Sequence, residues 1–198
     1  MNDVEDRLRA ALARPGHASS DFDLNPDVAL PAGRKLRPAG VLVGVTSFEK
    51  VPTVILTKRS SALKHHPGQI AFPGGKQDET DRDVRAAALR EAREEIGLPA
   101  SHVDVLGDLP THETVTGFSV TPVVAVIRDE FATQPEPGEV AEVFRVPLPH
   151  LLQPENYQIE ARAWRGQQRR FFTVPFGPYY IWGATARMLR GLAARMEE

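Results

Sequence analysis

Three glutamates in one short stretch are the residues of this sequence best suited to metal chemistry. Glu91, Glu94 and Glu95 occur within Arg90–Leu98, which reads REAREEIGL. At about 100° per residue in an α-helix, Glu94 lies roughly 60° to one side of Glu91 and Glu95 roughly 40° to the other. Three carboxylates therefore share one stripe, where each like-charge pair costs about 0.2–0.5 kcal/mol. A hard divalent cation would remove that repulsion, because such ions bind carboxylate oxygens together with substrate phosphates.

A glutamate-rich helix face also has a simpler interpretation. Acidic stripes are usually solvated surface, and that explanation needs no ligand. The triplet, however, follows Pro73-Gly74-Gly75 and precedes Gly97-Leu98, so it stands between a tight glycine turn and a helix end. Helical spacing by itself leaves both interpretations open.

The helix that carries these glutamates has clear expected limits. It should begin near Asp81 to Asp83, where acidic side chains suit the free N–H groups and the positive end of the helix dipole. It should end at Gly97, with Pro99 just beyond. A neighbouring apolar stripe is expected to face a core and consists of Ala88, Leu89, Ala92 and Ile96.

The stretch from Phe72 to Leu98 resembles the Nudix hydrolase signature. Arg90 through Leu98 fits its C-terminal half, R-E-apolar-x-E-E-x-G-apolar, at every fixed place. The N-terminal half departs from the general pattern, because Asp81 stands where the family usually has glutamate and eight residues, not seven, separate it from Arg90. The resemblance implies an α/β fold, a Nudix-type α/β/α sandwich with a mixed sheet. That domain would span residues 37–198, after an N-terminal helix and Pro-rich connector in residues 1–36.

A second motif upstream narrows the resemblance to one branch of the family. Leu56–Gly75 reads LTKRSSALKHHPGQIAFPGG. It is similar to the motif of the coenzyme A diphosphatase branch: L-L-T-x-R-S, a basic residue, then G-Q-apolar-small-F-P-G-G. Lys64 stands where this branch more often has arginine. Members of the branch cleave the diphosphate of coenzyme A and its thioesters, giving 3′,5′-ADP and (acyl-)4′-phosphopantetheine.

The resemblance implies that the helical carboxylates hold metal ions. The implied ligands are the backbone carbonyl of Gly75 and the side chains of Glu91, Glu94 and Glu95. Two or more Mg²⁺ or Mn²⁺ ions would neutralise the diphosphate oxygens, lower the pKa of a bound water and stabilise the leaving phosphate. Arg90 would orient a glutamate of the cluster through a charge-assisted hydrogen bond.

A further carboxylate is expected to accept the proton of the attacking water. In the family this role moves between the helix and later loops, so the candidates are Glu91 and Glu139. Glu142 is the alternative to Glu139, and plain solvent exposure explains either residue equally well.

Basic and polar residues just before the glycine turn are the candidates for substrate binding: Arg59, Lys64, His66 and Gln69. The 3′-phosphate of coenzyme A needs cationic donors, so replacing Arg59 or Lys64 is expected to narrow a preference for coenzyme A over its 3′-dephosphorylated form. Pairing with surface carboxylates is the alternative for both. Four arginines of a later segment are the second place to look: Arg162, Arg165, Arg169 and Arg170.

Apolar patterning predicts the elements that position these residues. An amphipathic helix is expected at Asp3–Ala13, and strands at Ala39–Phe48, Val51–Arg59, His102–Pro110, Phe118–Arg128 and from Val140 on. A hairpin is expected from Tyr157–Trp164 and Arg169–Phe176, and a last helix opening at Tyr180–Ala186. Tyr180 and Trp182 are expected to pack in the core.

Composition excludes several classes of function. The chain of 198 residues has a formal net charge of −2 and no long basic run, which argues against nucleic acid as a partner. It has no cysteine, so thiol chemistry and disulfides are excluded. No signal peptide or bilayer-length apolar run is present, so we expect a cytoplasmic monomer or homodimer acting on a small molecule. Two alternatives remain: a Nudix hydrolase of ADP-ribose, a dinucleotide or an oxidised nucleotide, and a non-catalytic ligand sensor.

Overall fold

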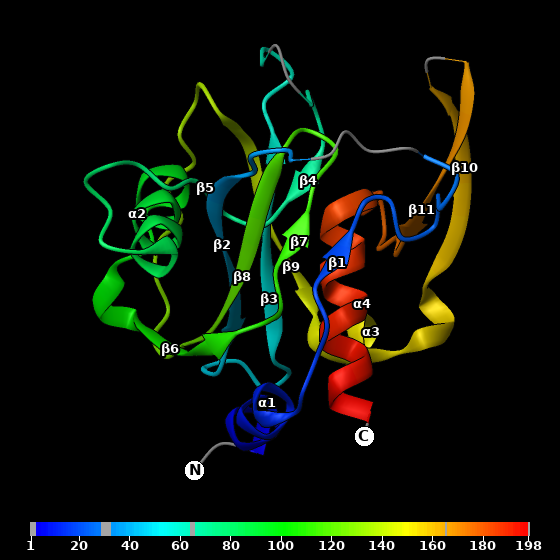
Figure 1. Ribbon diagram of the computed structural model, residues 1–198. Helices are drawn as coiled ribbons and strands as arrows, with labels where there is room; N and C mark the ends of the chain where they lie inside the picture. Colours follow the sequence, from blue (N-terminus) through cyan, green and yellow to red (C-terminus); the bar gives the residue numbers. More distant parts are fainter. Residues whose placement is uncertain (1–2, 29–32, 64–65, 165, 198) are drawn as a thin grey trace.

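The computed structural model describes residues 3–28, 33–63, 66–164 and 166–197 (Figure 1). Its elements, in chain order, are α1 (Asp3–Ala13), β1 (Ser19–Ser20), β2 (Arg37–Thr46), β3 (Thr53–Arg59), β4 (Ile70–Ala71), β5 (Gly74–Lys76), α2 (Val84–Ile96), η1 (Ala100–His102), β6 (Val103–Asp108), β7 (His112–Glu113), β8 (Phe118–Ile127), β9 (Val140–Pro147), α3 (Leu148–Leu152), η2 (Pro154–Asn156), β10 (Gln158–Trp164), β11 (Gln167–Thr173) and α4 (Gly183–Glu197).

A mixed sheet forms the middle layer of the molecule. Its strand order is β1-β7-β8-β2-β3-β4, with β5 paired to β2, β6 to β8 and β9 to β3. The long central pair β2–β8 is parallel, from Arg37↔Phe118 to Thr46↔Ile127. The pairs β3–β9 and β6–β8 are antiparallel. Helix α2 covers one face of the sheet and α4 the other, so the predicted α/β/α arrangement is confirmed (Figure 1).

The alternation of side chains along β2 separates two cores. Residues at every second position point to the same face of a strand. Leu42 belongs to the core on the α2 side, whereas Val43 belongs to the core on the α4 side. The α2-side core also contains Ile55, Ala88, Ala92, Ile96, Leu98, Val123, Ala125 and Ile127.

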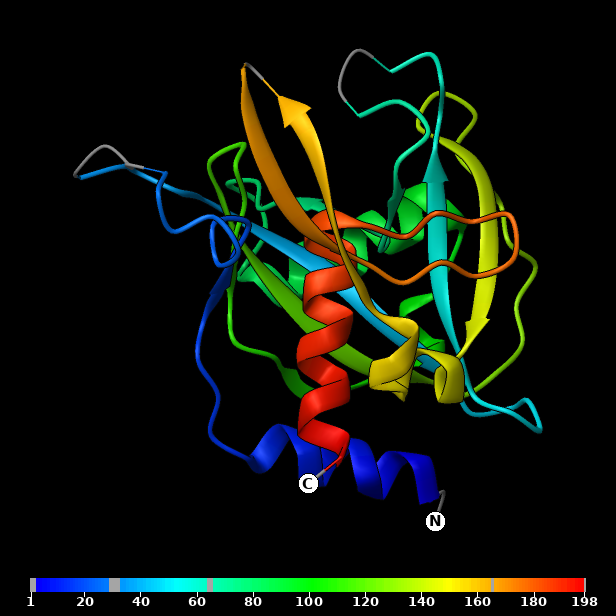
Figure 2. The same cartoon turned by 90° about the vertical axis from the view of Figure 1, so that its right-hand side faces the viewer.

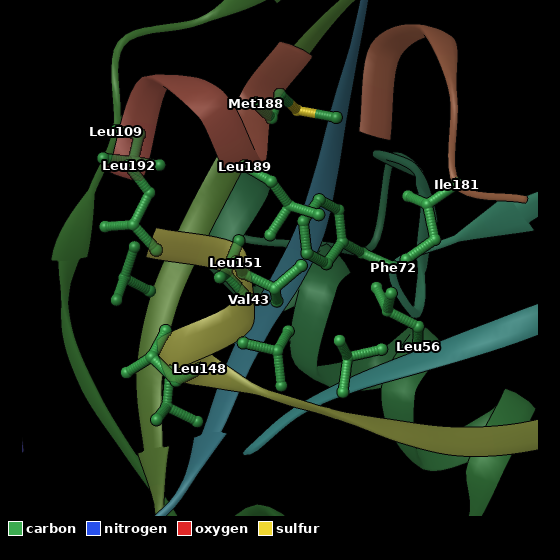
Figure 3. Packing of buried hydrophobic residues seen from close by; sticks show 14 of the residues in the cluster. Val43, Leu56, Phe72, Leu109, Leu148, Leu151, Ile181, Met188, Leu189 and Leu192 are labelled. Atoms are coloured by element: carbon green, nitrogen blue, oxygen red, sulfur yellow. The ribbon is translucent and has the colours of Figure 1, made fainter. Parts of the chain in front are cut away.

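The larger core lies between the sheet and α4 (Figure 3). Val43 and Leu56 come from the sheet and Phe72 from the chain before the glycine turn. Residues of α3, α4 and the segment before α4 complete it: Leu148, Leu151, Ile181, Met188, Leu189 and Leu192. This layer covers the face of the sheet opposite α2.

Helix α1 has the limits predicted from the sequence and packs on the end of the sheet. Its apolar face is buried, with Leu8 and Ala11 fully inaccessible. The Arg195 side chain of α4 donates to the carbonyls of Ala11 and Leu12, at 3.0 and 3.2 Å, and so caps the C-terminus of α1. The N-terminal segment therefore shares a core with the rest of the chain.

The Pro-rich connector contains a strand that sequence patterning did not indicate. Ser19 and Ser20 form β1 and pair in parallel with His112 and Glu113 of β7. Two polar residues carry no periodic signal, so long-range pairing alone defines this strand.

The expected late hairpin is present as β10–β11, antiparallel from Gln158↔Thr173 to Trp164↔Gln167. It extends away from the sheet beside α4 (Figures 1 and 2). Helix α4 begins at Gly183, slightly later than expected. Within the described ranges, no helix combines the length and apolar character needed to cross a bilayer.

A glycine on β2 sets how closely α2 approaches the sheet. A Cβ atom at Gly40 would lie 2.0 Å from the carbonyl oxygen of Val84, in the first turn of α2. Gly44, on the same face, would instead meet the terminal Cδ1 of Ile127, at 2.8 Å. Backbone cannot move as cheaply as a side-chain end, so only Gly40 controls the position of the helix.

We therefore predict that Gly40→Ala lowers the free energy of unfolding by about 1–3 kcal/mol, the usual cost of overpacking. Gly44→Ala, the control on the same strand face, should cost less. Urea denaturation of both variants measures the difference. Equal stability of the two variants would show that the contact between Gly40 and Val84 does not restrain α2.

Candidate active site

Helix α2 has the predicted limits because both of its ends are capped. The Asp83 side chain accepts a hydrogen bond from the N–H of Ala86 at 2.8 Å, as an N-cap. Gly97 ends the helix in a left-handed conformation with φ 73°, and its N–H donates to Arg93. The apolar stripe of α2 is buried against the sheet, as expected, so the glutamates lie along its border.

Glu95 lies beneath the glycine turn and is almost fully buried, with 5% of its surface exposed. The N–H of Gly74 donates to its Oε2 at 3.0 Å. Burial raises the pKa of Glu95 to about 7, and the charges of Glu91 and Glu139 act in the same direction. The hydrogen bond from Gly74 and the charge of Arg59 oppose this rise. This carboxyl group is therefore poorly supplied with cationic partners.

Glu91 is half-buried one turn earlier, against Gly75. A Cβ atom at Gly75 would lie 2.5 Å from Oε1 of Glu91, so glycine leaves the space that the carboxylate occupies. Burial raises the pKa of Glu91, Arg90 lowers it, and the charges of Glu94 and Glu139 raise it further. The turn thus contacts both acids. The N–H of Gly74 donates to Glu95, and the absence of a side chain at Gly75 leaves room for the carboxylate of Glu91.

Arg90 joins the acidic residues of the site. Its Nε and Nη2 donate to the two carboxylate oxygens of Asp81, at 3.0 and 2.9 Å. Its Nη1 donates to Glu91 and to Glu94, each at 2.9 Å. Arg90 therefore has the contact with a glutamate that the sequence analysis expected. Asp81, to which no role could be given from the sequence, holds the guanidinium on the opposite side, and Arg90 lowers the pKa of Asp81.

Glu94 differs from the other two glutamates because its side chain is largely exposed. Arg90 lies between Glu91 and Glu94. Among the residues that the structure describes, no three acidic or histidine side chains converge on one point. The structure brings Glu91, Glu95 and Glu139 into mutual electrostatic range and leaves Glu94 on the outer side of the arginine.

Glu139 is the better placed of the two later acids. It immediately precedes β9, its carbonyl accepts from the N–H of Ser60 at 2.7 Å, and its charge acts on both Glu91 and Glu95. Glu142 instead accepts a hydrogen bond from the hydroxyl of Tyr179. Glu142 is thus engaged elsewhere, and Glu139 remains the candidate from this strand.

The candidate substrate residues have different positions. Arg59 ends β3 and its charge acts on Glu95; its Nε is inaccessible to solvent and has no hydrogen-bond partner among the described residues. The carbonyl of Gln69 accepts from the N–H of Arg59 at 2.9 Å. His66 is exposed, with a positive φ of 53°. Lys64 lies outside the described residues, so its predicted role is not examined by the structure.

The donor set fits a hard divalent cation. The side chains of Glu91, Glu95 and Glu139 act on one another electrostatically without converging on one point, and they offer carboxylate oxygens, the ligand type that Mg²⁺ and Mn²⁺ prefer. Their mutual repulsion and the burial of Glu95 would be relieved by a positive ion. A free carboxylate cluster with this much burial has a physical reason to bind metal.

Comparison with known proteins agrees with this fold. Residues 36–165 match the NUDIX domain, and the chain belongs to the Nudix hydrolase family. It is 43% identical over 162 residues to a Cronobacter sakazakii protein named Uncharacterized Nudix hydrolase NudL, covering 82% of this chain and 84% of that one. It is 38% identical over 177 residues to the Pectobacterium atrosepticum protein of the same name, covering 89% and 92%.

Among solved structures, a MutT/nudix family protein from Enterococcus faecalis has a similar fold. The TM-score is 0.51 at 14% sequence identity, and the match covers 85% of this chain and 64% of that one. At this identity the likeness concerns the fold alone.

Two residues of the site were not assigned from the sequence. Gly74 supplies an N–H donor to Glu95, and Asp81 supports Arg90. The glycine pair was an available signal, since a carboxylate near such a turn can reach exposed N–H groups. The role of Asp81 had no signal, because its contact depends on the shape of the loop before α2.

The raised pKa of Glu95 predicts a pH-dependent stability of the metal-free protein. The pKa rises from an ordinary value of 4.5 to about 7 on folding, so the neutral carboxyl stabilises the fold fully below pH 4.5. That stabilisation is lost as the pH rises through 7. Between pH 4.5 and pH 8, the free energy of unfolding of wild type should therefore fall by about 3 kcal/mol relative to that of Glu95→Gln.

Urea denaturation in the presence of a chelator, repeated across this pH range, tests this prediction. Glu94→Gln is the control, because it removes an exposed charge from the same helix and should change stability by only about 0.5 kcal/mol. Parallel pH profiles for wild type and Glu95→Gln would contradict the burial of an ionisable group at this position.

Proposed function

We propose that this Nudix hydrolase cleaves the diphosphate linkage of coenzyme A and its thioesters, giving 3′,5′-ADP and (acyl-)4′-phosphopantetheine. One observation carries the proposal. The segment that resembles the coenzyme A branch, Leu56–Gly75, contributes Arg59, whose charge acts on Glu95, and the glycine turn, in which the N–H of Gly74 donates to Glu95. The motif that suggests the substrate therefore borders the acids suited to the chemistry.

The acids of α2 would hold Mg²⁺ or Mn²⁺, together with the carbonyl of Gly75. When bound, the ions supply charge neutralisation for the diphosphate and activation of a water molecule. Arg90 fixes the orientation of Glu91, because its other edge is held by Asp81. Glu139 or Glu91 would accept the proton of the attacking water.

Arg59 is placed to act on the diphosphate itself. Its charge acts on Glu95 and lowers the pKa of that residue, which favours a role near the acids. Arginine also suits the paired oxygens of a phosphate. This position argues for a contact with the diphosphate, and it removes Arg59 as the main reader of the 3′-phosphate. His66 and Gln69 remain candidates for contacts beside it.

The acids can be tested singly. Glu91→Gln and Glu95→Gln should each reduce turnover by at least about a hundredfold, the scale of one lost electrostatic stabiliser. Both variants should fold, since each change relieves repulsion. Steady-state rates with Mg²⁺ and with Mn²⁺ measure the effect. Glu155→Gln, an exposed acid on η2, is the control; wild-type rates in either α2 variant would exclude the metal-site assignment.

A substrate panel tests the specificity. Coenzyme A and its thioesters should be cleaved faster than ADP-ribose, dinucleotides or oxidised nucleotides. Coenzyme A should exceed its 3′-dephosphorylated form in kcat/KM by about tenfold or more, the scale of a charged hydrogen bond. Arg59→Ala should slow both of these substrates alike. Faster turnover of another nucleoside diphosphate derivative would replace the coenzyme A assignment, and no turnover of any substrate would indicate a ligand sensor.

A further inference from the structure

One face of the β10–β11 hairpin places two arginines side by side. Arg162 and Arg169 are direct cross-strand partners, so their side chains leave the sheet on the same face. Like charges directly opposite each other destabilise a strand pair. The carboxylate of Glu160, on the same face, accepts a hydrogen bond from the hydroxyl of Tyr180 at 2.7 Å. An anion between the arginines would convert this repulsion into attraction.

Aromatic rings hold Arg162 in place. Its guanidinium carbon lies 5.6 Å from the ring centre of Phe171, 5.1 Å from that of Tyr180 and 5.6 Å from that of Trp182. Phe171 and Trp182 also contact each other edge to face, at 5.1 Å. Tyr180 and Trp182 were expected to pack in the core, but both are only half-buried. A guanidinium carries five N–H donors, and contacts with aromatic rings leave donors for an anion.

Arg169 is held in a similar way on the other strand. Its guanidinium carbon lies 5.5 Å from the ring centre of Phe22, a residue of the connector. Asn25 of the same connector bonds to the backbone of Arg170 in both directions, at 2.8 and 2.9 Å. The connector thus fixes β11, and the two arginines are presented by a supported surface.

A short chain of contacts links this arginine face to the candidate active site. Trp182 bridges to Thr173 of β11 and immediately precedes α4. In the first turn of α4, the hydroxyl of Thr185 donates to the carbonyl of Ile70 at 3.1 Å. Ile70 follows Gln69, whose carbonyl accepts from Arg59. The hairpin and the chain after β3 also extend beyond the same end of the sheet (Figure 2).

Coenzyme A carries its diphosphate and its 3′-phosphate on different positions of one ribose. Recognition of both groups therefore requires cations at two separate places. Arg59 is assigned to the diphosphate, so a second group of cations is needed for the 3′-phosphate. Paired arginines suit a phosphomonoester dianion, because each can donate two parallel hydrogen bonds to its oxygens.

We propose that Arg162 and Arg169 of the β10–β11 hairpin bind the 3′-phosphate of the substrate. This inference rests on the proposed function, since the 3′-phosphate is what distinguishes coenzyme A from other Nudix substrates. Arg162 and Arg169 act in binding and specificity, apart from the acids of α2.

Equilibrium binding tests the inference without turnover. Adenosine 3′,5′-bisphosphate and adenosine 5′-monophosphate are titrated by calorimetry into wild type, Arg162→Gln and Arg169→Gln. The bisphosphate should bind wild type more tightly, and each variant should weaken its binding by about tenfold or more while changing the monophosphate little. Arg170→Gln is the matched control: it is adjacent to Arg169 but on the opposite face, and its contacts to Asn25 are made by backbone.

Three results would overturn the inference: equal binding of the two nucleotides to wild type, unchanged bisphosphate binding in both variants, or the same loss in Arg170→Gln. Thermal unfolding of each variant establishes that the hairpin remains folded, and Arg162→Lys, which keeps the charge, should recover part of the binding.

Kinetics separate this inference from the proposed function. In the two variants the KM for coenzyme A should rise towards that of the 3′-dephosphorylated form, with kcat little changed. Wild type that binds the bisphosphate through these arginines but cleaves no coenzyme A would refute the proposed function alone. Wild type that cleaves coenzyme A, with its 3′-phosphate preference intact in both variants, would refute the hairpin assignment alone.

Discussion

Burial of the Glu95 carboxyl group under the glycine turn is the constraint on which the rest of the site depends. An ionised carboxylate removed from water is costly unless donors or cations replace the lost hydration. Here the protein supplies one N–H, from Gly74, and the charge of Arg59, while Glu91 and Glu139 add repulsion. The position of α2 creates this situation, and Gly40 permits that position. The fold thus builds a site in which repulsion between buried acids is only partly offset by the protein's own donors and charges.

Much of this arrangement could be predicted from the sequence because its signals are local. Asp83 and Gly97 are capping residues, and they define α2 whatever the helix packs against. The apolar runs of β2, β3 and β8 predict buried strands, which the structure confirms. The Nudix signature predicts the mixed α/β/α fold and the family, both of which are confirmed. The coenzyme A specificity remains a prediction, since the names of the two NudL relatives state no substrate.

What could not be predicted depends on partners distant in the sequence. The strand β1 exists because Ser19 meets His112. Glu113 forms an ion pair with Arg34, and Glu142 accepts a hydrogen bond from the hydroxyl of Tyr179. The residues next to them in the sequence do not indicate such contacts. Residue type and spacing therefore identified which acids could act, and only the tertiary structure separated Glu139 from those already paired.

The cap that Arg195 places on α1 has a consequence for local unfolding. Its guanidinium bonds to Ala11 and Leu12, so the first helix and the last part of α4 share their hydrogen bonds. Opening of α4 would leave the carbonyls at the end of α1 without these donors, and opening of α1 would expose the side chain of Arg195. The two chain segments should therefore open together, as one cooperative unit in hydrogen exchange. That unit lies at the end of the molecule away from the hairpin tip (Figure 1), which separates fraying of the chain ends from motions of the hairpin.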